Sequence, residues 1–462
     1  GAIDTHVHFE LPVGETVSAD NYESGTRAAA CGGTTMIIDF ATQEKGMGLV
    51  ETVHDRFKHI EPKACVDYSF HIAITDLTDK ILDEFKTSVE FGIPSFKLYM
   101  VYENMMVDDG AIADALERSK ETGVLIAVHA ENPYLISRRI KKLLSQGKTS
   151  AWYHYESRPE FVEVDAVRRM VYLAKSLKAP LYIVHLASRE GLDEIIKARD
   201  EGLEIYAETC PHYLNFTNEV YKREDGRNFI CSPAIKGEDS RKALWEGLRR
   251  GYISTVATDH CPFKSYEKDW GKDDFTKTPN GCMGVENMYP YMLSEANKGQ
   301  ISFNKVVEVC SENVAKIFGC SPQKGTIAVG SDADIVIYDP KKKFIISKEN
   351  MHSEVDYTIW ENCEMTGYPI MTFSRGRLAA ELINETVDVL ETIGEKRFFD
   401  EYRSRCFILG REITIHPNYN DEGIRARGLD IADDGGLIVE YLEGPEKEKT
   451  ETLHTGEISI SI

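Results

Sequence analysis

Near the start of the chain, Ala2-Ile3-Asp4-Thr5-His6-Val7-His8 is a strand-like run that contains two histidines near its end, and the fold prediction begins from it. Seven similar runs follow before residue 261, separated by segments of helical spacing such as 111–122, 166–177 and 191–201. Together the runs cover residues 2–8, 34–40, 66–72, 95–100, 124–130, 181–187, 204–210 and 253–260. Strands separated by helix-length crossovers are most simply parallel, and eight such α/β units close a (β/α)8 TIM barrel. The alternative is a doubly wound open sheet, although no GxGxxG motif follows a strand to support it.

The sequence beyond the eighth run predicts two further parts. A loop rich in turn residues, 264–283, precedes two helical stretches, the second near 303–318. A turn at 324–326 then leads into a strand over 331–340, and strand-like segments continue to about 376. From about residue 378 an acidic helical stretch runs to 405, followed by short strands with turns at 433–436. We therefore expect a barrel over 1–323, partial β-sandwich strands over 324–377 and a separate segment over 378–462.

The composition limits the class of protein and its partners. Of the 462 residues, 42% are hydrophobic and 28% charged, as in an ordinary globular enzyme. The formal net charge of −22 argues against a nucleic acid or an anionic membrane as partner. We expect no transmembrane helix, and no signal peptide in the chain as given. The ten cysteines form no CxxC pair, so we expect reduced thiols and a cytoplasmic location.

Polar residues fall where the predicted strands end. A lone histidine at a strand end is usually a hydrogen-bonded core residue, and His54, His59, His71 and His212 are weaker candidates, with His71 a possible neighbour of the ligands. The carboxyl ends of barrel strands converge on one rim, where barrel active sites lie. A joint ligand set is therefore expected from six residues: His6, His8, Lys97, His129, His185 and Asp259.

The types of side chain in this set predict two zinc ions. Imidazole and carboxylate donors suit Zn²⁺, and six groups exceed what one tetrahedral ion uses. A pair of ions needs a bridging anion, whereas the ammonium of Lys97 would repel both. Reaction of its amine with CO2 would give a carbamate that bridges the pair. Without the histidines, a rim lysine paired with an acid would be the preferred interpretation of Lys97.

Five motifs resemble those of the hydantoinase/dihydropyrimidinase branch of the amidohydrolase superfamily, over about residues 1–376. They are His6-Val7-His8, Ser95-Phe96-Lys97-Leu98-Tyr99-Met100, His129-Ala130-Glu131-Asn132, Val184-His185-Leu186 and Ala257-Thr258-Asp259-His260-Cys261. The resemblance implies a first zinc on His6, His8 and Asp259. It implies a second on His129 and His185, with the N6-carboxylated lysine bridging the two.

Three further residues carry over from the resemblance. Tyr102 is similar to a tyrosine that polarises the scissile carbonyl, while Ser232 and Asn280 are similar to residues that hold the amide edge of the substrate through backbone groups. Each has an ordinary explanation by itself, a packing aromatic or a turn. The implied reaction opens a ring amide of a small cyclic substrate to an N-carbamoyl amino acid, with Asp259 as base and then acid. A homo-oligomer, dimer or tetramer, is also implied.

Both ends depart from this family pattern. Family members usually begin with strands that build half of the side sandwich, so we expect that half to be absent here. The other end resembles the SH3-like C-terminal domain of biotin–protein ligases over about 378–462, without that enzyme's catalytic motifs. The resemblance lies in Leu378-Ala379-Ala380-Glu381-Leu382, Tyr402-Arg403-Ser404-Arg405, Leu409-Gly410-Arg411-Glu412 and Thr455-Gly456-Glu457-Ile458-Ser459. We expect no ligase activity from it.

Two alternative functions remain open at this point. Allantoinase and dihydroorotase share the metal architecture, but dihydroorotase-like sites place an arginine just after the HxH motif. Here Phe9-Glu10-Leu11-Pro12 follows His8, which favours a neutral or apolar ring. The non-enzyme alternative is a scaffold like the dihydropyrimidinase-related neuronal proteins, which lack several metal ligands that this chain keeps.

Overall fold

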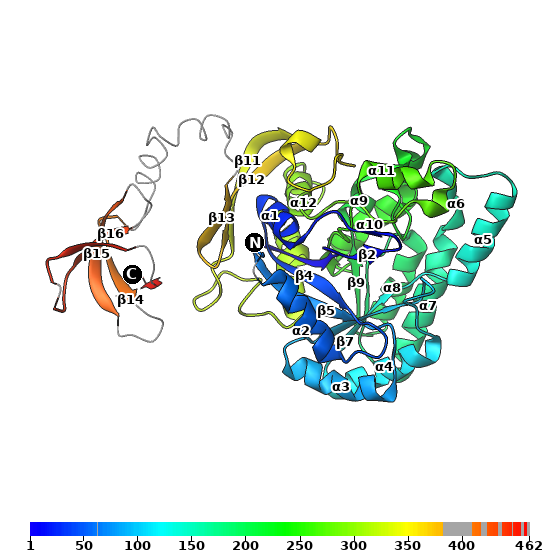
Figure 1. Ribbon diagram of the computed structural model, residues 1–462, viewed down its shortest axis with the longest axis horizontal. Helices are drawn as coiled ribbons and strands as arrows, with labels where there is room; N and C mark the ends of the chain where they lie inside the picture. Colours follow the sequence, from blue (N-terminus) through cyan, green and yellow to red (C-terminus); the bar gives the residue numbers. More distant parts are fainter. Residues whose placement is uncertain are drawn as a thin grey trace. The chain divides into compact units, whose positions relative to one another are not determined.

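The computed structural model describes residues 1–61, 63–381, 409–416, 423–432, 437–445, 447–453 and 457–459. The chain divides into two compact units, Gly1–Leu382 and Ile383–Ile462. The first unit holds an eight-stranded sheet surrounded by helices, and a smaller three-stranded sheet (Figure 1). Among the described residues, no helix is long and apolar enough to cross a lipid bilayer.

The eight-stranded sheet is the predicted barrel. Its strands are parallel and follow one another in sequence order. They are β1 (Ala2–Val7), β4 (Thr34–Thr42), β5 (Asp67–Ala73), β6 (Ser95–Tyr99), β7 (Leu125–His129), β8 (Leu181–Ile183), β9 (Ile205–Thr209) and β10 (Thr255–Val256). A parallel bridge between Val7 and His260 joins the last segment to the first, and the His8 amide donates to the His260 carbonyl at 2.9 Å. The open-sheet alternative is therefore wrong, because the two edges meet.

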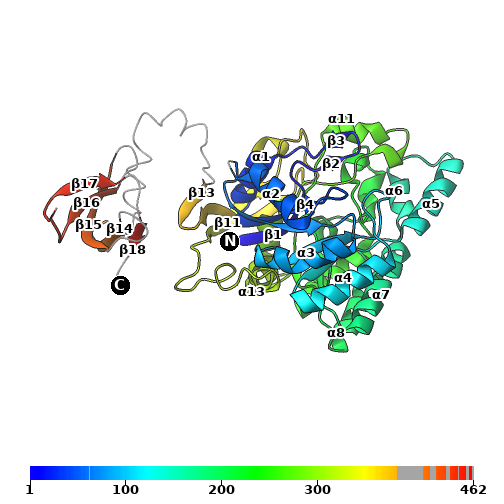
Figure 2. The ribbon, with the colours of Figure 1, turned by 60° about the horizontal axis from the view of Figure 1, so that its bottom comes forward.

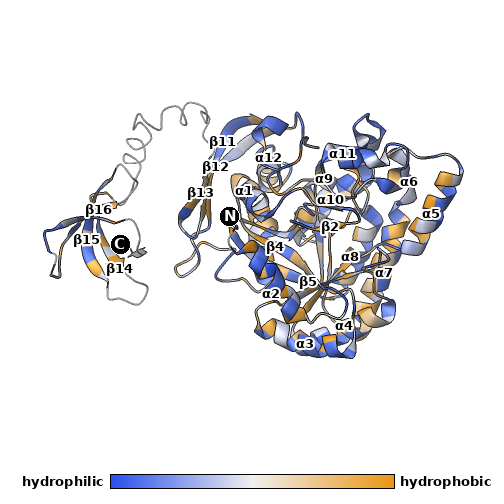
Figure 3. Cartoon of the chain, viewed as in Figure 1, coloured by the Kyte–Doolittle hydropathy of each residue, from blue (hydrophilic) through white to orange (hydrophobic). Residues whose placement is uncertain are grey.

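Amphipathic helices cover the outside of the barrel (Figure 2). The main ones are α1 (Tyr22–Cys31), α2 (Leu49–Ile60), α3 (Asp79–Glu90), α4 (Asp109–Thr122), α5 (Pro133–Ser145), α7 (Glu160–Leu177), α8 (Arg189–Asp200) and α10 (Glu238–Arg250). Figure 3 shows hydrophilic and hydrophobic residues alternating along them, as expected for helices that bury one face. The predicted helices at 111–122, 166–177 and 191–201 correspond to α4, α7 and α8. The helix predicted near 303–318 is present and contains a π-helical turn, Glu308–Glu312, between α13 (Phe303–Val307) and α14 (Asn313–Ile317).

Side chains alternate between the two faces of the barrel strands. On β7, Ile126 and Val128 join the large outer core under the helices, while Leu125 and Ala127 face inward. The inner cluster also takes in Phe318, which follows α14. This apolar cluster fills the part of the barrel interior away from the carboxyl ends of the strands. Only the rim at those carboxyl ends is left for polar side chains.

The small sheet of the first unit is antiparallel. It consists of β11 (Ile335–Ile345), β12 (Glu364–Ser374) and β13 (Arg377–Glu381). The strand predicted at 331–340 therefore begins four residues later and runs further. The helical stretch expected from about 378 is wrong at its start, because Arg377–Glu381 pairs with β12. The rest of that stretch, to 405, lies outside the described residues.

The second unit contains a five-stranded antiparallel sheet in the order β17-β16-β15-β14-β18. The strands are β14 (Glu412–His416), β15 (Ile424–Ile431), β16 (Leu437–Tyr441), β17 (Thr450–Leu453) and β18 (Glu457–Ser459). A small apolar core lies on one face, formed mainly by Ile413, Ile415, Ala426 and Val439. The predicted turn at 433–436 lies outside the described residues.

Candidate metal centre

The residues of the predicted ligand set come together at the rim of the barrel, although two of the strands that carry them are shorter than expected. Strand β8 ends at Ile183 and β10 at Val256, so His185 and Asp259 lie beyond the strands rather than at their ends. Both residues have a left-handed backbone, with φ of 38° and 51°. Such a conformation is unfavourable for residues with a Cβ and is typical of functional sites.

One group of donors consists of His6, His8 and Asp259. The Nε2 atoms of both histidines lie 3.1 Å from Oδ1 of Asp259. One ligand atom from each residue lies within 4.8 Å of the other two. Three donors of mixed imidazole and carboxylate character, at this separation, fit a zinc ion.

A second group lies beside the first. Nδ1 of His129 is 3.0 Å from Nε2 of His185, and the rings of His185 and His6 are 5.3 Å apart, centroid to centroid. Lys97 connects the groups, with Nζ 3.2 Å from Nε2 of His6. The lysine is only 1% exposed, and within the described part of the chain no carboxylate oxygen lies within 4.0 Å of Nζ. The structure therefore does not support a simple lysine–acid ion pair here.

Two buried carboxylates orient these imidazoles from outside, and the sequence prediction missed both as site residues. Oε1 of Glu208 lies 2.7 Å from Nδ1 of His6, and Oε2 of Glu131 lies 2.9 Å from Nε2 of His129. Arg158 donates to Glu131 at 2.7 Å. A carboxylate on one ring nitrogen leaves the other facing the centre, as in zinc sites. The alternation of β9 could have identified Glu208, because it shares the inner face with Tyr206.

Burial and charge set the protonation of the donors. Burial lowers the pKa of His8 to about 4 and that of His185 well below its usual value, so both imidazoles are neutral near pH 7. Burial alone would raise the pKa of Asp259, but His6 and His8 hold it well below its ordinary range. Burial lowers the pKa of Lys97 to about 8, which makes its neutral amine accessible. The neutral imidazoles of His8 and His185, the ionised carboxylate of Asp259 and the accessible amine of Lys97 fit a pair of zinc ions with a carboxylated lysine.

Tyr102, Ser232 and Asn280 also gather at this rim. The ring of Tyr102 lies 5.3 Å from that of His129, and its backbone has a φ of 74°. Burial raises the pKa of its phenol, with Arg158 and Ser232 acting against the rise, so the hydroxyl keeps its proton. The Asn280 amide donates to the Ser232 hydroxyl at 2.9 Å. The structure thus joins three residues that lie far apart in the sequence.

The four weaker histidine candidates are not part of the ligand set. His71 has both ring nitrogens occupied, by the Ser95 hydroxyl at 2.6 Å and the Thr5 carbonyl at 3.0 Å. Burial lowers its pKa to about 3, so it is a neutral residue of the barrel interior. His54 and His59 lie on α2, and His212 lies on α9 (Pro211–Asn215).

Replacing Glu131 with Gln should weaken the second group of donors. The amide is nearly isosteric but no longer balances the charge of Arg158 or holds the tautomer of His129. We expect metal affinity or kcat to fall about 10- to 100-fold, the usual effect of losing such a carboxylate. Zinc content after dialysis and steady-state kinetics measure this. Glu194→Gln, at a surface ion pair with Arg168, is the control, and equal losses in both variants would contradict the role.

Comparisons with known proteins identify the family of the chain. The profile of the Amidohydrolase family matches residues 1–379. A D-hydantoinase of Ralstonia pickettii is 40% identical over 386 residues, covering 82% of this chain and 84% of that protein. The dihydropyrimidinase of Rattus norvegicus is 40% identical over 388 residues, covering 82% of this chain and 75% of that protein. The crystal structure of a dihydropyrimidinase from Brevibacillus agri matches with a TM-score of 0.80 at 40% identity, covering 82% of this chain and 83% of the other.

Proposed function

The chain belongs to the amidohydrolase family, and from this premise we propose that it hydrolyses the ring amide of hydantoins and 5,6-dihydropyrimidines to N-carbamoyl amino acids. The observation that carries the proposal is the convergence of four imidazoles, one carboxylate and a buried lysine on the barrel rim. A non-catalytic scaffold has no need of this set. The relatives named D-hydantoinase and dihydropyrimidinase supply the substrate class.

We assign two zinc ions to the site. His6, His8 and Asp259 would hold the first, and His129 and His185 the second, with the carboxylated side chain of Lys97 between them. Zinc bound there would supply a hydroxide nucleophile near neutral pH and polarise the scissile carbonyl. The protein contributes the fixed orientation of the His6 and His129 rings, which Glu208 and Glu131 hold by hydrogen bonds.

The remaining residues transfer protons and bind the ring of the substrate. Asp259, ionised and 3.1 Å from two imidazoles, takes the proton of the nucleophile and returns it to the leaving amide nitrogen. The Tyr102 hydroxyl, which keeps its proton, donates a hydrogen bond to the carbonyl oxygen as negative charge develops there. The backbone groups of Ser232 and Asn280 pair with the amide edge of the ring.

Tyr102→Phe should retain the fold and both metals but lose the hydrogen bond to the developing oxyanion. Removing one such donor lowers kcat on the order of 10²-fold. The measurement is steady-state kinetics at matched zinc content. Tyr134→Phe, an exposed tyrosine at 74%, is the control. An unchanged kcat in Tyr102→Phe would assign this ring to packing alone.

Rates on dihydrouracil, hydantoin, allantoin and dihydroorotate test the substrate class. The carboxylate of dihydroorotate needs a cation, and the residue after the HxH motif, Phe9, is apolar and fully buried. We therefore expect turnover of the first two compounds to exceed that of dihydroorotate. The relatives named D-hydantoinase and dihydropyrimidinase are the reason to expect that it also exceeds that of allantoin. Preference for allantoin or dihydroorotate would contradict the proposed substrate class but not the proposed metal centre. No turnover of any cyclic amide by the zinc-loaded protein would refute the enzymatic proposal.

We further propose that residues 378–462 include an SH3-like module related to the C-terminal domain of biotin–protein ligases, and that the chain forms a dimer or tetramer. The five antiparallel strands of the second unit support the first part. The module carries no ligase activity in this proposal. Light scattering of the full chain measures the oligomeric state.

A further inference from the structure

Lys268, the last residue of α11 (Ser265–Lys268), is fully buried and makes three hydrogen bonds to backbone carbonyls. Its Nζ donates to Ile230 at 3.0 Å, to Pro279 at 2.8 Å and to Gly281 at 2.7 Å. An ammonium has three donors, so all of them are used. Within the described residues, no carboxylate oxygen lies within 4.0 Å of it. The Phe263 ring also lies close, with its centroid 5.6 Å from Nζ. A buried charge held mainly by carbonyl dipoles fixes those carbonyls firmly, because releasing one leaves the charge less compensated.

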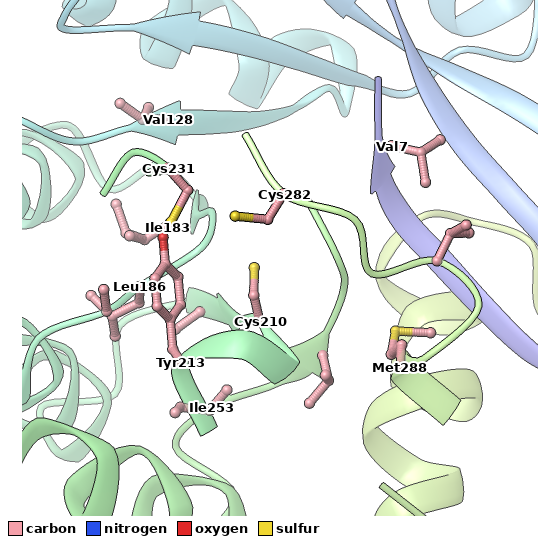
Figure 4. Close-up of a cluster of buried hydrophobic side chains, with 14 of the residues drawn as sticks. Val7, Val128, Ile183, Leu186, Cys210, Tyr213, Cys231, Ile253, Cys282 and Met288 are labelled. Atoms are coloured by element: carbon pink, nitrogen blue, oxygen red, sulfur yellow. The ribbon is translucent and has the colours of Figure 1, made fainter. Parts of the chain in front are cut away.

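The three carbonyls belong to the two loops that carry Ser232 and Asn280. The loops, 230–234 and 279–283, also touch directly, since the Gly281 amide donates to the Ile230 carbonyl at 2.9 Å. Below them, the side chains of Cys231 and Cys282 turn toward each other in a buried cluster (Figure 4). Lys268 is thus the cation on which both loops converge.

The bonds to Lys268 also determine where the neighbouring peptide groups point. The Pro279–Asn280 peptide is trans, so its N–H is opposite to the carbonyl that faces Lys268. The Asn280 carbonyl likewise points away from the Gly281 amide, which faces Ile230. In the described structure, neither the backbone N–H nor the backbone C=O of Asn280 or Ser232 has a hydrogen-bond partner. Free donors and acceptors are what a ring amide edge requires.

The second loop is also confined on its other side. Gly281 has a φ of 145°, and a Cβ there would lie 2.1 Å from the carbonyl oxygen of Cys261. The loop therefore passes between the backbone at Cys261 and the ammonium of Lys268, with no room to adjust toward the former. The position of the second loop is therefore determined by its hydrogen bonds to Lys268.

We propose that Lys268 is a positioning residue that holds the loops of Ser232 and Asn280 in register, so that their free backbone groups meet the amide edge of the cyclic substrate. The substrate part of this inference rests on the proposed function. The lysine touches neither the substrate nor the metal ligands, so its effect is on binding of the ring rather than on the nucleophile.

Lys268→Met tests the proposal, because methionine keeps the length of the chain and removes all three donors. Lys268→Gln is a milder variant that keeps an N–H donor. We expect KM for dihydrouracil or hydantoin to rise about 10- to 100-fold in Lys268→Met, and less in Lys268→Gln, with zinc content unchanged. Amide hydrogen exchange at 230–234 and 279–283 should also become faster, and more so in Lys268→Met than in Lys268→Gln.

The matched control is Lys324→Met. Lys324 is another buried lysine with three partners, Asp67, Asp332 and Asp334, but it lies beside the small sheet. Its loss should lower the melting temperature while leaving KM and exchange in the two loops unchanged. Unchanged loop exchange in Lys268→Met would overturn the inference whatever the activity. An unchanged KM with faster loop exchange would overturn its substrate part. An inactive wild-type protein would count against the proposed function alone, since the exchange measurement still decides the role of Lys268.

Discussion

Lys97→Ala is expected to lower kcat/KM for cyclic amides by on the order of 10³-fold or more, because losing the proposed bridge between two zinc ions would remove several kcal/mol of transition-state stabilisation. The reason lies in the surroundings of Lys97. Its Nζ is buried among imidazoles, 3.2 Å from Nε2 of His6, and no carboxylate oxygen of the described residues lies within 4.0 Å of it. The alanine variant should also bind less than two zinc ions per chain, measured by elemental analysis.

Rescue by small acids separates a carboxylated lysine from an ordinary one. Alanine leaves a cavity open to acetate, propionate or bicarbonate, whose carboxylate can take the position of the missing group. We expect partial recovery of activity with these acids in Lys97→Ala. Lys97→Arg, which fills the space with a permanent cation, should not recover. Full activity of Lys97→Ala with two zinc ions and no added acid would contradict the assigned bridge. Lys316→Ala, an exposed lysine paired with Glu312, controls for a general effect of removing a charge.

Asp259→Asn is expected to lower kcat on the order of 10⁴-fold, near the upper end of what a general acid–base contributes. Asparagine is nearly isosteric and keeps an oxygen near His6 and His8, but it cannot accept the proton of the nucleophile. The neighbouring histidines hold the pKa of Asp259 well below its usual range. The wild-type base therefore stays ionised at neutral pH and is lost only as the pH falls through that lowered value. The acidic limb of the pH–kcat profile should disappear in the variant.

The zinc content of Asp259→Asn separates the two roles of this side chain. If two ions remain and kcat still collapses, the loss belongs to proton transfer. If one ion is lost, the carboxylate acts first as a ligand, and kcat should recover when zinc is added in excess. A kcat close to that of the wild type would contradict both roles. Asp269→Asn, at a surface ion pair with Arg227, is the control.

The sequence predicted the bounds of most barrel strands well. Strands β1, β4, β5, β6, β7 and β9 differ from the predicted runs by at most two residues at either end, because apolar and β-branched residues recur there at the strand period. The prediction was poorer for β8 and β10. Residues 184–187 and 257–260 have strand-like composition, but the chain turns there to bring His185 and Asp259 over the rim. A local pattern does not contain that turn.

The donor side chains at the strand ends, and the zinc chemistry proposed from them, could be inferred from the amino-acid sequence, because residue type and strand period are local properties. The tertiary structure was needed to show that Glu208 orients the ring of His6, and that Lys268 binds the loops of Ser232 and Asn280. These contacts join residues that lie as much as 202 positions apart. Their partners are chosen by how the closed barrel brings its loops together, and no spacing in the sequence records that choice.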